Sequence, residues 1–241
     1  MCEAIFQRHE LKFLVNEEQR AALEAAFADR MIPDPHGEST ICNVYYDTPD
    51  YRLIRQSLEK PVYKEKLRLR SYGPAMPETE VFLELKKKYD GVVYKRRIAL
   101  TERQAEDYFN ALAPLPSDSQ IGREIDYFRA FYGTLLPAVY LCYDRCAFFS
   151  RENRDLRVTF DRRICYRREA VRLTSPAGGR EILQKGQSLM EIKAAQAIPL
   201  WLVELLNRNG IRQTSFSKYG EAYKTILTDA RLVNHGGICY V

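Results

Sequence analysis

The sequence predicts an α+β protein: a closed antiparallel β-barrel with helices packed on the outside. Strand patterns occur near both ends of the chain and through its middle, and helix signals separate them. No linker or low-complexity stretch divides the 241 residues. We therefore expect a single domain over residues 1–241, built on one large antiparallel sheet.

The strand signals are alternation of polar and apolar residues, or enrichment in β-branched and aromatic residues. Asp90-Gly91 is the strongest hairpin signal, and a polar turn at Glu152–Asp155 predicts a second hairpin. The expected strands are Phe6–Val15, Thr40–Asp47, Val62–Tyr72, Glu80–Tyr89, Val92–Leu100, Pro137–Phe149, Leu156–Tyr166 and Ser188–Ala194.

Capping residues and prolines mark the helices. Asn16 and Thr101 offer N-caps, Pro49 and Pro199 open helices, and Gly210 ends one. The expected helices run from Asn16 to about Arg30, from Pro49 to about Leu58, over Glu102–Leu112, Arg123–Tyr132 and Leu200–Asn209, and from Lys218 to about Ala230. Loops are expected from Pro33 and over Ala170–Gly186, and a loose tail from Val233.

Five of the expected strands separate charged from apolar residues, because side chains two positions apart share a face. In Val62–Tyr72 the bases alternate with Leu67 and Leu69. The charged sets are Lys64, Lys66, Arg68 and Arg70; Arg8, Glu10 and Lys12; Glu84, Lys86 and Lys88; Lys95 and Arg97; Glu191 and Lys193. On one strand such a face is typical of a solvated sheet surface.

Repetition on so many strands favours another interpretation, because like charges on neighbouring strands repel unless an anion or metal complements them. Closing the sheet would turn these faces inward and leave the apolar faces to the helices. Arg and Lys suit a chain of linked phosphates, and isolated Glu residues suit a divalent cation bound to it. A basic interior that binds linear phosphates is therefore predicted.

Composition narrows the class of protein. The net charge of +5 is only a weak pointer to anionic partners. The six cysteines form no C-x-x-C pair and the three histidines are scattered, so we expect reduced thiols and no zinc site. No apolar run is long enough for a signal peptide or a membrane span, so a cytoplasmic protein is expected.

Nine segments, taken in order, resemble the triphosphate tunnel fold of the CYTH-like superfamily, and within it the VTC domain of polyphosphate polymerases. They begin with RHELKF and YYDTPDY and end with MEIK and SFSKY. The segments are Arg8–Phe13, Tyr45–Tyr51, Lys66–Arg70, Glu84–Lys88, Val93–Arg97, Tyr143–Phe148, Leu156–Asp161, Met190–Lys193 and Ser215–Tyr219.

The resemblance implies a metal-dependent transferase that passes the terminal phosphoryl group of ATP, or of another nucleoside triphosphate, to polyphosphate. It implies Mn²⁺ or Mg²⁺ as cofactor. The implied phosphate-binding residues are Lys66, Arg68, Arg70, Lys86, Lys95, Arg97 and Lys193. The implied catalytic residues, which would stabilise the moving phosphoryl group, are Lys12, Arg145, Arg157 and Lys218. The implied metal ligands are Glu191, then Glu10 and Glu84.

Two other functions stay open. A hydrolase of triphosphates would use the same tunnel, but hydrolytic members carry E-x-E-x-K in the first strand, where this chain has Arg8 at the first acidic position. A nucleic-acid-binding module would use basic strands interleaved with Tyr63, Tyr72, Tyr89 and Tyr94 on an open surface. We expect no nucleic acid partner, and the sequence leaves the oligomeric state open.

Several residues also have a structural interpretation. Arg157 shares a face with Asp161 and could pair with it, and Asp47 is expected to cap the helix that Pro49 begins. The residues expected to be solvated charges or helix core instead of site residues are Lys64, Lys88, Arg163, Tyr219 and Trp201.

Overall fold

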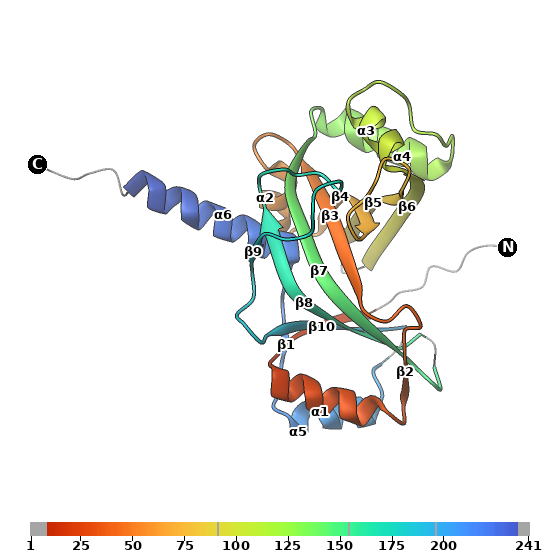
Figure 1. The fold of residues 1–241 in the computed structure, drawn as a ribbon, viewed down its shortest axis with the longest axis vertical. Coiled ribbons are helices and arrows are strands. Elements are labelled where there is room, and N and C mark those ends of the chain that lie inside the picture. Colours follow the sequence, from red (N-terminus) through yellow and green to blue (C-terminus); the bar gives the residue numbers. More distant parts are fainter. Residues whose placement is uncertain (1–8, 91, 154, 196, 236–241) are drawn as a thin grey trace, which may run out of the picture.

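One antiparallel sheet forms the body of the protein (Figure 1). The structure, a computed structural model, describes residues 9–90, 92–153, 155–195 and 197–235. Its strands are β1 (His9–Val15), β2 (Met31–Pro33), β3 (Ser39–Asp47), β4 (Tyr63–Tyr72), β5 (Glu80–Tyr89), β6 (Val92–Thr101), β7 (Leu136–Ser150), β8 (Arg157–Arg167), β9 (Arg180–Glu181), β10 (Ser188–Ala194) and β11 (Gln213–Thr214).

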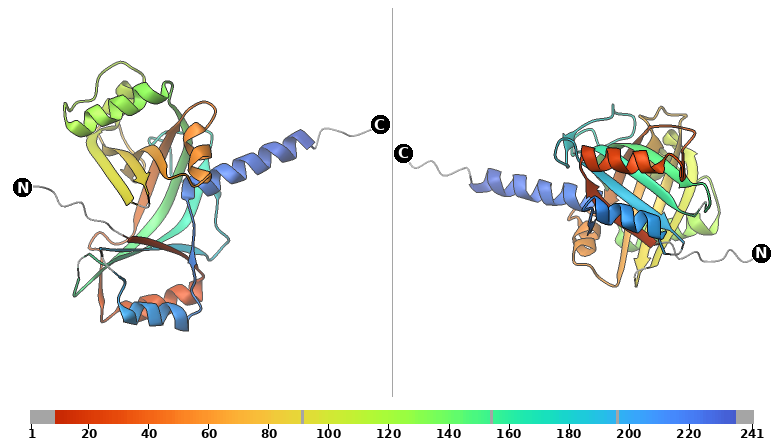
Figure 2. Two further views of the ribbon diagram at one scale, coloured as in Figure 1. Left: turned by 180° about the vertical axis from the view of Figure 1, so that it is seen from behind. Right: turned by 90° about the horizontal axis from the view of Figure 1, so that it is seen from below.

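The closed barrel expected from the sequence is not formed. The hydrogen-bonded order is β11-β1-β10-β8-β7-β3-β4-β5-β6, and in the described ranges no strand pairing joins β6 back to β1 or β11. The sheet curls instead (Figure 2), and side chains span the gap: Lys86 Nζ on β5 lies 3.9 Å from Glu10 Oε2 on β1. On β1 both neighbouring positions of Lys12 are already taken, by Glu191 of β10 and Thr214 of β11.

The described ranges form six helices, which lie on the sheet or extend from it: α1 (Glu17–Phe27), α2 (Arg52–Leu58), α3 (Glu102–Phe109), α4 (Gln120–Tyr132), α5 (Leu200–Arg208) and α6 (Lys218–His235). The outer faces of β4–β6 pack on α3 and α4, with Leu67, Leu83 and Leu85 fully buried. The outer faces of β1, β8 and β10 pack on α1 and α5 through a second core that contains Phe160 and Ile192. The apolar faces are therefore covered by helices, as predicted, and α6 projects from the body (Figure 1).

The described elements differ from the expected ones mainly at their ends. The first helix stops at Phe27 because the chain enters β2, which pairs with β7. β2, β11 and the two-residue β9 were not predicted. Such short strands carry too few residues to show an alternation.

Four further helices begin or end more than one residue away from their expected bounds. α2 begins at Arg52 instead of Pro49, and α3 ends at Phe109 instead of Leu112. Ser119 accepts a hydrogen bond from the Gly122 amide, so α4 begins at Gln120 instead of Arg123. α6 continues to His235, past the expected end at Ala230, so the expected tail from Val233 begins as helix. Residues 236–241 lie outside the described part of the chain.

Asp47 caps α2, as predicted. Its carboxylate accepts hydrogen bonds from the amides of Leu53 (2.8 Å) and Ile54 (3.0 Å), and the hydroxyl of Tyr219 donates to it at 2.8 Å. Tyr219 is 2% exposed and stacks on Tyr45, so its expected place in the core is confirmed. This contact fixes the start of α6 beside the inner face of the sheet.

Within the described residues no helix combines the length and the apolar character needed to cross a membrane.

Candidate active site

The concave face of the sheet gathers basic side chains from strands far apart in the sequence. On β4, Leu67 and Leu69 are buried on the outer face, whereas Lys66, Arg68 and Arg70 are half-buried on the inner face. The same alternation holds on the neighbouring strands because each outer face packs on helices. The bases that the strand registers and α6 bring to this inner face are Lys12, Lys66, Arg68, Arg70, Lys86, Lys95, Arg97, Arg145, Arg157, Lys193 and Lys218.

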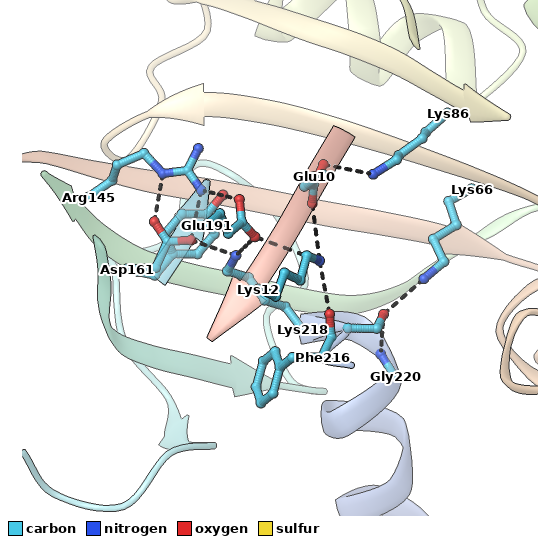
Figure 3. A network of polar contacts seen from close by, with 12 residues as sticks. Glu10, Lys12, Lys66, Lys86, Arg145, Asp161, Glu191, Phe216, Lys218 and Gly220 are labelled. Carbon is cyan, nitrogen blue, oxygen red and sulfur yellow. Dashed lines mark hydrogen bonds and ion pairs between the residues drawn. The ribbon is translucent and has the colours of Figure 1, made fainter. Parts of the chain in front are cut away.

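An acidic pair lies at the centre of one group of these bases (Figure 3). Asp161, which is 0% exposed, accepts two hydrogen bonds from Arg145 at 2.6 and 2.7 Å and lies 2.5 Å from Lys218 Nζ. Glu191 contacts the same two bases, Lys218 at 3.0 Å and Arg145 at 3.3 Å, and lies 3.7 Å from Lys12 Nζ. Burial opposes ionisation of Glu191, but Lys218, Lys12 and Arg145 outweigh it and hold its pKa well below the ordinary value.

A second group surrounds Glu84 on β5. The carboxylate, 1% exposed, lies 2.6 Å from Arg68 Nε, 2.5 Å from Lys95 Nζ and 3.9 Å from Arg70 Nε. Burial raises the pKa of Glu84, but Arg68, Arg70 and Lys95 more than offset it and lower the pKa to about 2. Glu84 is therefore an anion that holds three bases in place.

Tyr143 on β7 connects the two groups. Its hydroxyl accepts from Arg70 at 3.3 Å, and its ring lies 5.2 Å from the Arg145 guanidinium and 4.6 Å from Lys218 Nζ. Burial raises the pKa of Tyr143, yet Arg145, Arg70 and Lys218 lower it to about 8. The positive potential of this interior therefore makes the phenol of Tyr143 easier to ionise than usual, although at neutral pH most of it keeps its proton.

Several lysines lack enough negative charge around them. Burial, reinforced by Lys86 and Lys12, lowers the pKa of Lys66 to about 7. Burial also lowers the pKa of Lys95 to about 8, although Glu84 opposes that shift. The pKa values of Lys86 and Lys193 are lowered too, first by burial. An anion placed among these side chains would restore their charge, so the interior is built for a polyanion.

Lys66 and Lys12 also fix one side of this interior to the segment that precedes α6. Lys66 Nζ donates to Ser217 Oγ at 3.0 Å, and Lys12 Nζ donates to the Phe216 carbonyl at 2.9 Å (Figure 3). Strands β1 and β4 therefore meet through this segment, although they are not neighbours in the sheet.

The carboxylates of the basic interior are candidate ligands for a divalent cation. In the described residues no group of three or more His, Cys, Asp or Glu side chains is arranged to hold a metal. Glu10 and Glu191 nevertheless flank one cationic position, because Lys12 Nζ lies 3.2 Å from the first and 3.7 Å from the second. Mg²⁺ commonly takes one or two carboxylates and completes its shell with phosphates and water, so this pair fits such a metal.

The remaining sequence-based candidates lie as follows. Arg157 does not pair with Asp161: its guanidinium lies 3.7 Å from Asp34 and 4.8 Å from the centre of the Phe149 ring. Asp161 binds Arg145 and Lys218 instead. Arg97 is exposed and lies 4.7 Å from the centre of the Phe82 ring.

The residues that the sequence predicted to be solvated charges or helix core lie in different surroundings. Lys64 donates to the Ser57 carbonyl at 3.1 Å, and Lys88 is half-buried. Arg163 is exposed and pairs with Asp144, whereas Trp201 is half-buried against the core beneath α1. The prediction that Arg163 lies outside the basic interior is thus confirmed.

Three of the four tyrosines named for a nucleic-acid-binding surface lie away from the bases. Tyr63 on β4, Tyr89 on β5 and Tyr94 on β6 share the registers of the outer face, opposite the bases. Tyr72 is exposed and shares a face with Arg68 and Arg70 on β4, so one of the four rings lies on the same side of the sheet as the bases.

Three residues of the site escaped the sequence analysis: Asp161 as a partner of two bases, Tyr143 as their bridge, and Ser217 as a contact of Lys66. Asp161 has a sequence signal, because it shares a strand face with Arg157 and Thr159. Tyr143 has none, since an aromatic residue in a strand is ordinarily core.

Comparisons with known proteins agree on the fold. The family model described as "VTC domain" matches residues 7–227. A solved Bacillus halodurans structure, suggested to be an adenylate cyclase, is similar at TM-score 0.53 and 16% identity, over 88% of this chain and 95% of that one. A Hippeastrum protein, described as a suggested adenylyl cyclase with a dominant triphosphatase activity, is similar at TM-score 0.50 and 15% identity, over 95% and 96%. No curated protein sequence matches the chain.

Proposed function

Because the chain belongs to the VTC domain family of the triphosphate tunnel, CYTH-like superfamily, we propose that it is a phosphotransferase acting on linked phosphates. It moves the terminal phosphoryl group of a nucleoside triphosphate, with ATP as the first candidate, to the end of a polyphosphate chain. The whole of residues 1–241 serves as one such domain.

The observation that carries this proposal is the excess of positive charge that lines the concave face, half-buried at Lys66 and exposed at Lys95. Lys66 and Lys95 have pKa values lowered to about 7 and about 8, first by burial, because the nearby carboxylates do not compensate them. A linear polyanion that contacts several strands at once would supply the missing charge. A compact monoanion would reach only one of the two groups of bases.

The residues that bind the triphosphate lie around Glu84. Arg68, Arg70 and Lys95 are oriented by this carboxylate, and their remaining N–H groups bind phosphate oxygens. Lys66, Lys86, Arg97 and Lys193 extend the phosphate site along the interior. These side chains hold the triphosphate extended, which is the positioning that phosphoryl transfer requires.

The residues around Glu191 and Asp161 act on the moving group. Lys12, Arg145, Arg157 and Lys218 stabilise the charge that spreads over the equatorial oxygens in the transition state. Asp161 keeps Arg145 and Lys218 in position through its ion pairs. Glu10 and Glu191 hold Mn²⁺ or Mg²⁺, which neutralises charge on the phosphates when bound.

A triphosphatase is the second candidate. The dominant triphosphatase activity described for the Hippeastrum protein, whose fold this chain shares, favours it. Arg8, which stands at the first acidic position of the hydrolytic motif and so favours transfer over hydrolysis, lies outside the described part of the chain. Water in place of an acceptor phosphate would give hydrolysis with the same residues.

Product analysis tests the proposal. The protein is incubated with ATP and Mn²⁺, or Mg²⁺, with and without a short polyphosphate primer, and orthophosphate, ADP and chain length are followed together. Transfer predicts ADP and lengthening chains with little orthophosphate. If orthophosphate forms in amounts equal to ADP and the chains do not lengthen, the protein is a triphosphatase and the proposal is wrong. If neither ATP nor primer is consumed, both functions are refuted.

A further inference from the structure

Three thiols form a row on the outer face of the sheet, away from the basic interior. Cys42 on β3 is directly opposite Cys142 on β7, and Cys142 is directly opposite Cys165 on β8. All three are free and buried, with exposed fractions of 0%, 4% and 9%. Residues directly opposite in an antiparallel pair have Cα atoms about 4.5–5.5 Å apart, which is within the range that a disulfide spans.

The three sulfur atoms are not equivalent. Cys142 is the central sulfur of the row, because it lies directly opposite Cys42 on one side and Cys165 on the other. Cys165, the Gly178 backbone and the nearby Arg167 hold the pKa of Cys142 below its ordinary value and so favour its thiolate. Cys42 instead accepts a hydrogen bond from the Tyr140 hydroxyl at 3.1 Å. Cys142 is therefore the nucleophile of the row, and Cys165 is its partner.

A loop covers this pair and is held by one side chain. Arg167 donates to the carbonyls of Pro176 at 2.7 Å and Gly178 at 3.0 Å, and its guanidinium lies 3.6 Å from the centre of the Tyr140 ring. At Gly179 the backbone lies so close to β8 that an added Cβ would be 2.4 Å from the Tyr166 carbonyl oxygen. Opening of this loop would expose Cys165 first, since it is the most exposed of the three thiols.

We propose that Cys142 and Cys165 form a redox-active dithiol that hydroperoxides oxidise to a cross-strand disulfide. The Cys142 thiolate attacks the hydroxyl oxygen of the peroxide and breaks the O–O bond, giving a sulfenic acid and an alkoxide, or hydroxide when the oxidant is hydrogen peroxide, which takes a proton from water. The Cys165 sulfur then attacks the Cys142 sulfur and releases water, and its thiol proton leaves with that water. The two sulfurs together lose two electrons, which reduce the O–O bond.

Cys165 is chosen over Cys42 as the resolving thiol because Cys42 is fully buried and already accepts a hydrogen bond from Tyr140, whereas Cys165 is the more exposed of the two. The pair also lies one residue from Tyr143, which touches Arg70, Arg145 and Lys218 in the basic interior. Between the Cys142–Cys165 and Asp144–Arg162 pairs the β7–β8 register shifts, so the disulfide would close directly beside a bulge.

The test uses the full chain with Cys2, Cys146 and Cys239 replaced by Ser, so that other thiols do not react. Folded protein is treated with hydrogen peroxide, the remaining thiols are blocked, and peptides are mapped by mass spectrometry without reduction. We expect one major product, lighter by two hydrogen atoms, in which Cys142 is linked to Cys165 and from which dithiothreitol restores both thiols.

Two variants of this background provide matched controls. Cys42→Ser should leave the yield of the Cys142–Cys165 link within about twofold, whereas Cys165→Ser should lower disulfide yield about tenfold or more and leave Cys142 as sulfenic or sulfinic acid. A predominant link between Cys42 and Cys142, or three unmodified thiols after peroxide treatment, would overturn the proposal. The peptide map of the background protein decides the matter even if a variant does not fold.

Discussion

Binding of triphosphate is expected to draw protons into the basic interior at pH 8. Unliganded Lys66 has a pKa of about 7 because burial, Lys86 and Lys12 disfavour its charge. At pH 8 such a group is about one-tenth protonated, and contact with phosphate oxygens would return its pKa toward the ordinary value of about 10. Lys66 alone therefore takes up about 0.9 proton per bound ligand. Lys95, with a pKa of about 8, adds about 0.5.

Isothermal titration calorimetry in two buffers of different ionisation enthalpy, at equal pH, measures this uptake directly. The protein should take up about 1.4 protons, and Lys66→Met should reduce the value to about 0.5. Lys87→Met is the control, because Lys87 lies on the outer face of β5 beside Glu65 and Glu124. Proton release on binding, or equal uptake by the protein and the Lys66→Met variant, would refute the assignment of Lys66 to the phosphate site.

The other expected effects concern stability and turnover. Between pH 7 and 10 the unfolded chain binds more protons at Lys66 than the folded one, so without ligand the free energy of unfolding should rise with pH, and urea titrations of Lys66→Met should show a shallower rise. Glu191→Gln should abolish metal-dependent turnover; near-normal rates at saturating Mn²⁺ would remove Glu191 from the site. Asp161→Asn breaks buried ion pairs to two bases and should cost about 3 kcal/mol of stability by urea unfolding, and a cost below about 1 kcal/mol would contradict the buried network. Asp47→Asn weakens the cap of α2 and should cost about 2 kcal/mol in the same assay, with no change at all counting against the cap.

The two-residue period of the strands explains why most of the inner face was predictable. A strand that buries Leu67 and Leu69 under helices must send Lys66, Arg68 and Arg70 to the other side, whatever its neighbours are. The covering of the outer faces by helices followed from the same pattern. Alternation says which side chains share a face, so the bases of β1, β4, β5, β6 and β10 could be predicted from single strands, whereas Arg145, Arg157 and Lys218 were implied only by the family resemblance.

Closure and pairing depend on contacts that one strand does not encode. The gap between β6 and β1 depends on how strands from opposite ends of the sheet meet, and the expected barrel failed there. The choice of Arg145, not Arg157, as the partner of Asp161 is set by register across β7 and β8, where Arg145 is directly opposite Asp161. Tyr143 belongs to the site because bases surround it. A tyrosine in a strand gives no sequence signal of such a role.

The central claim, that the bases on one side of the sheet bind a polyanion, is tested most directly by two neighbouring lysines on β5. Lys86 shares the inner face and lies 3.9 Å from Glu10, whereas Lys87 lies on the outer face, 3.9 Å from Glu65. The dissociation constant of triphosphate, measured by calorimetry at fixed salt and pH 7, should rise about tenfold or more for Lys86→Met and stay within about twofold for Lys87→Met. Equal weakening by both substitutions, or none by Lys86→Met, would contradict the account.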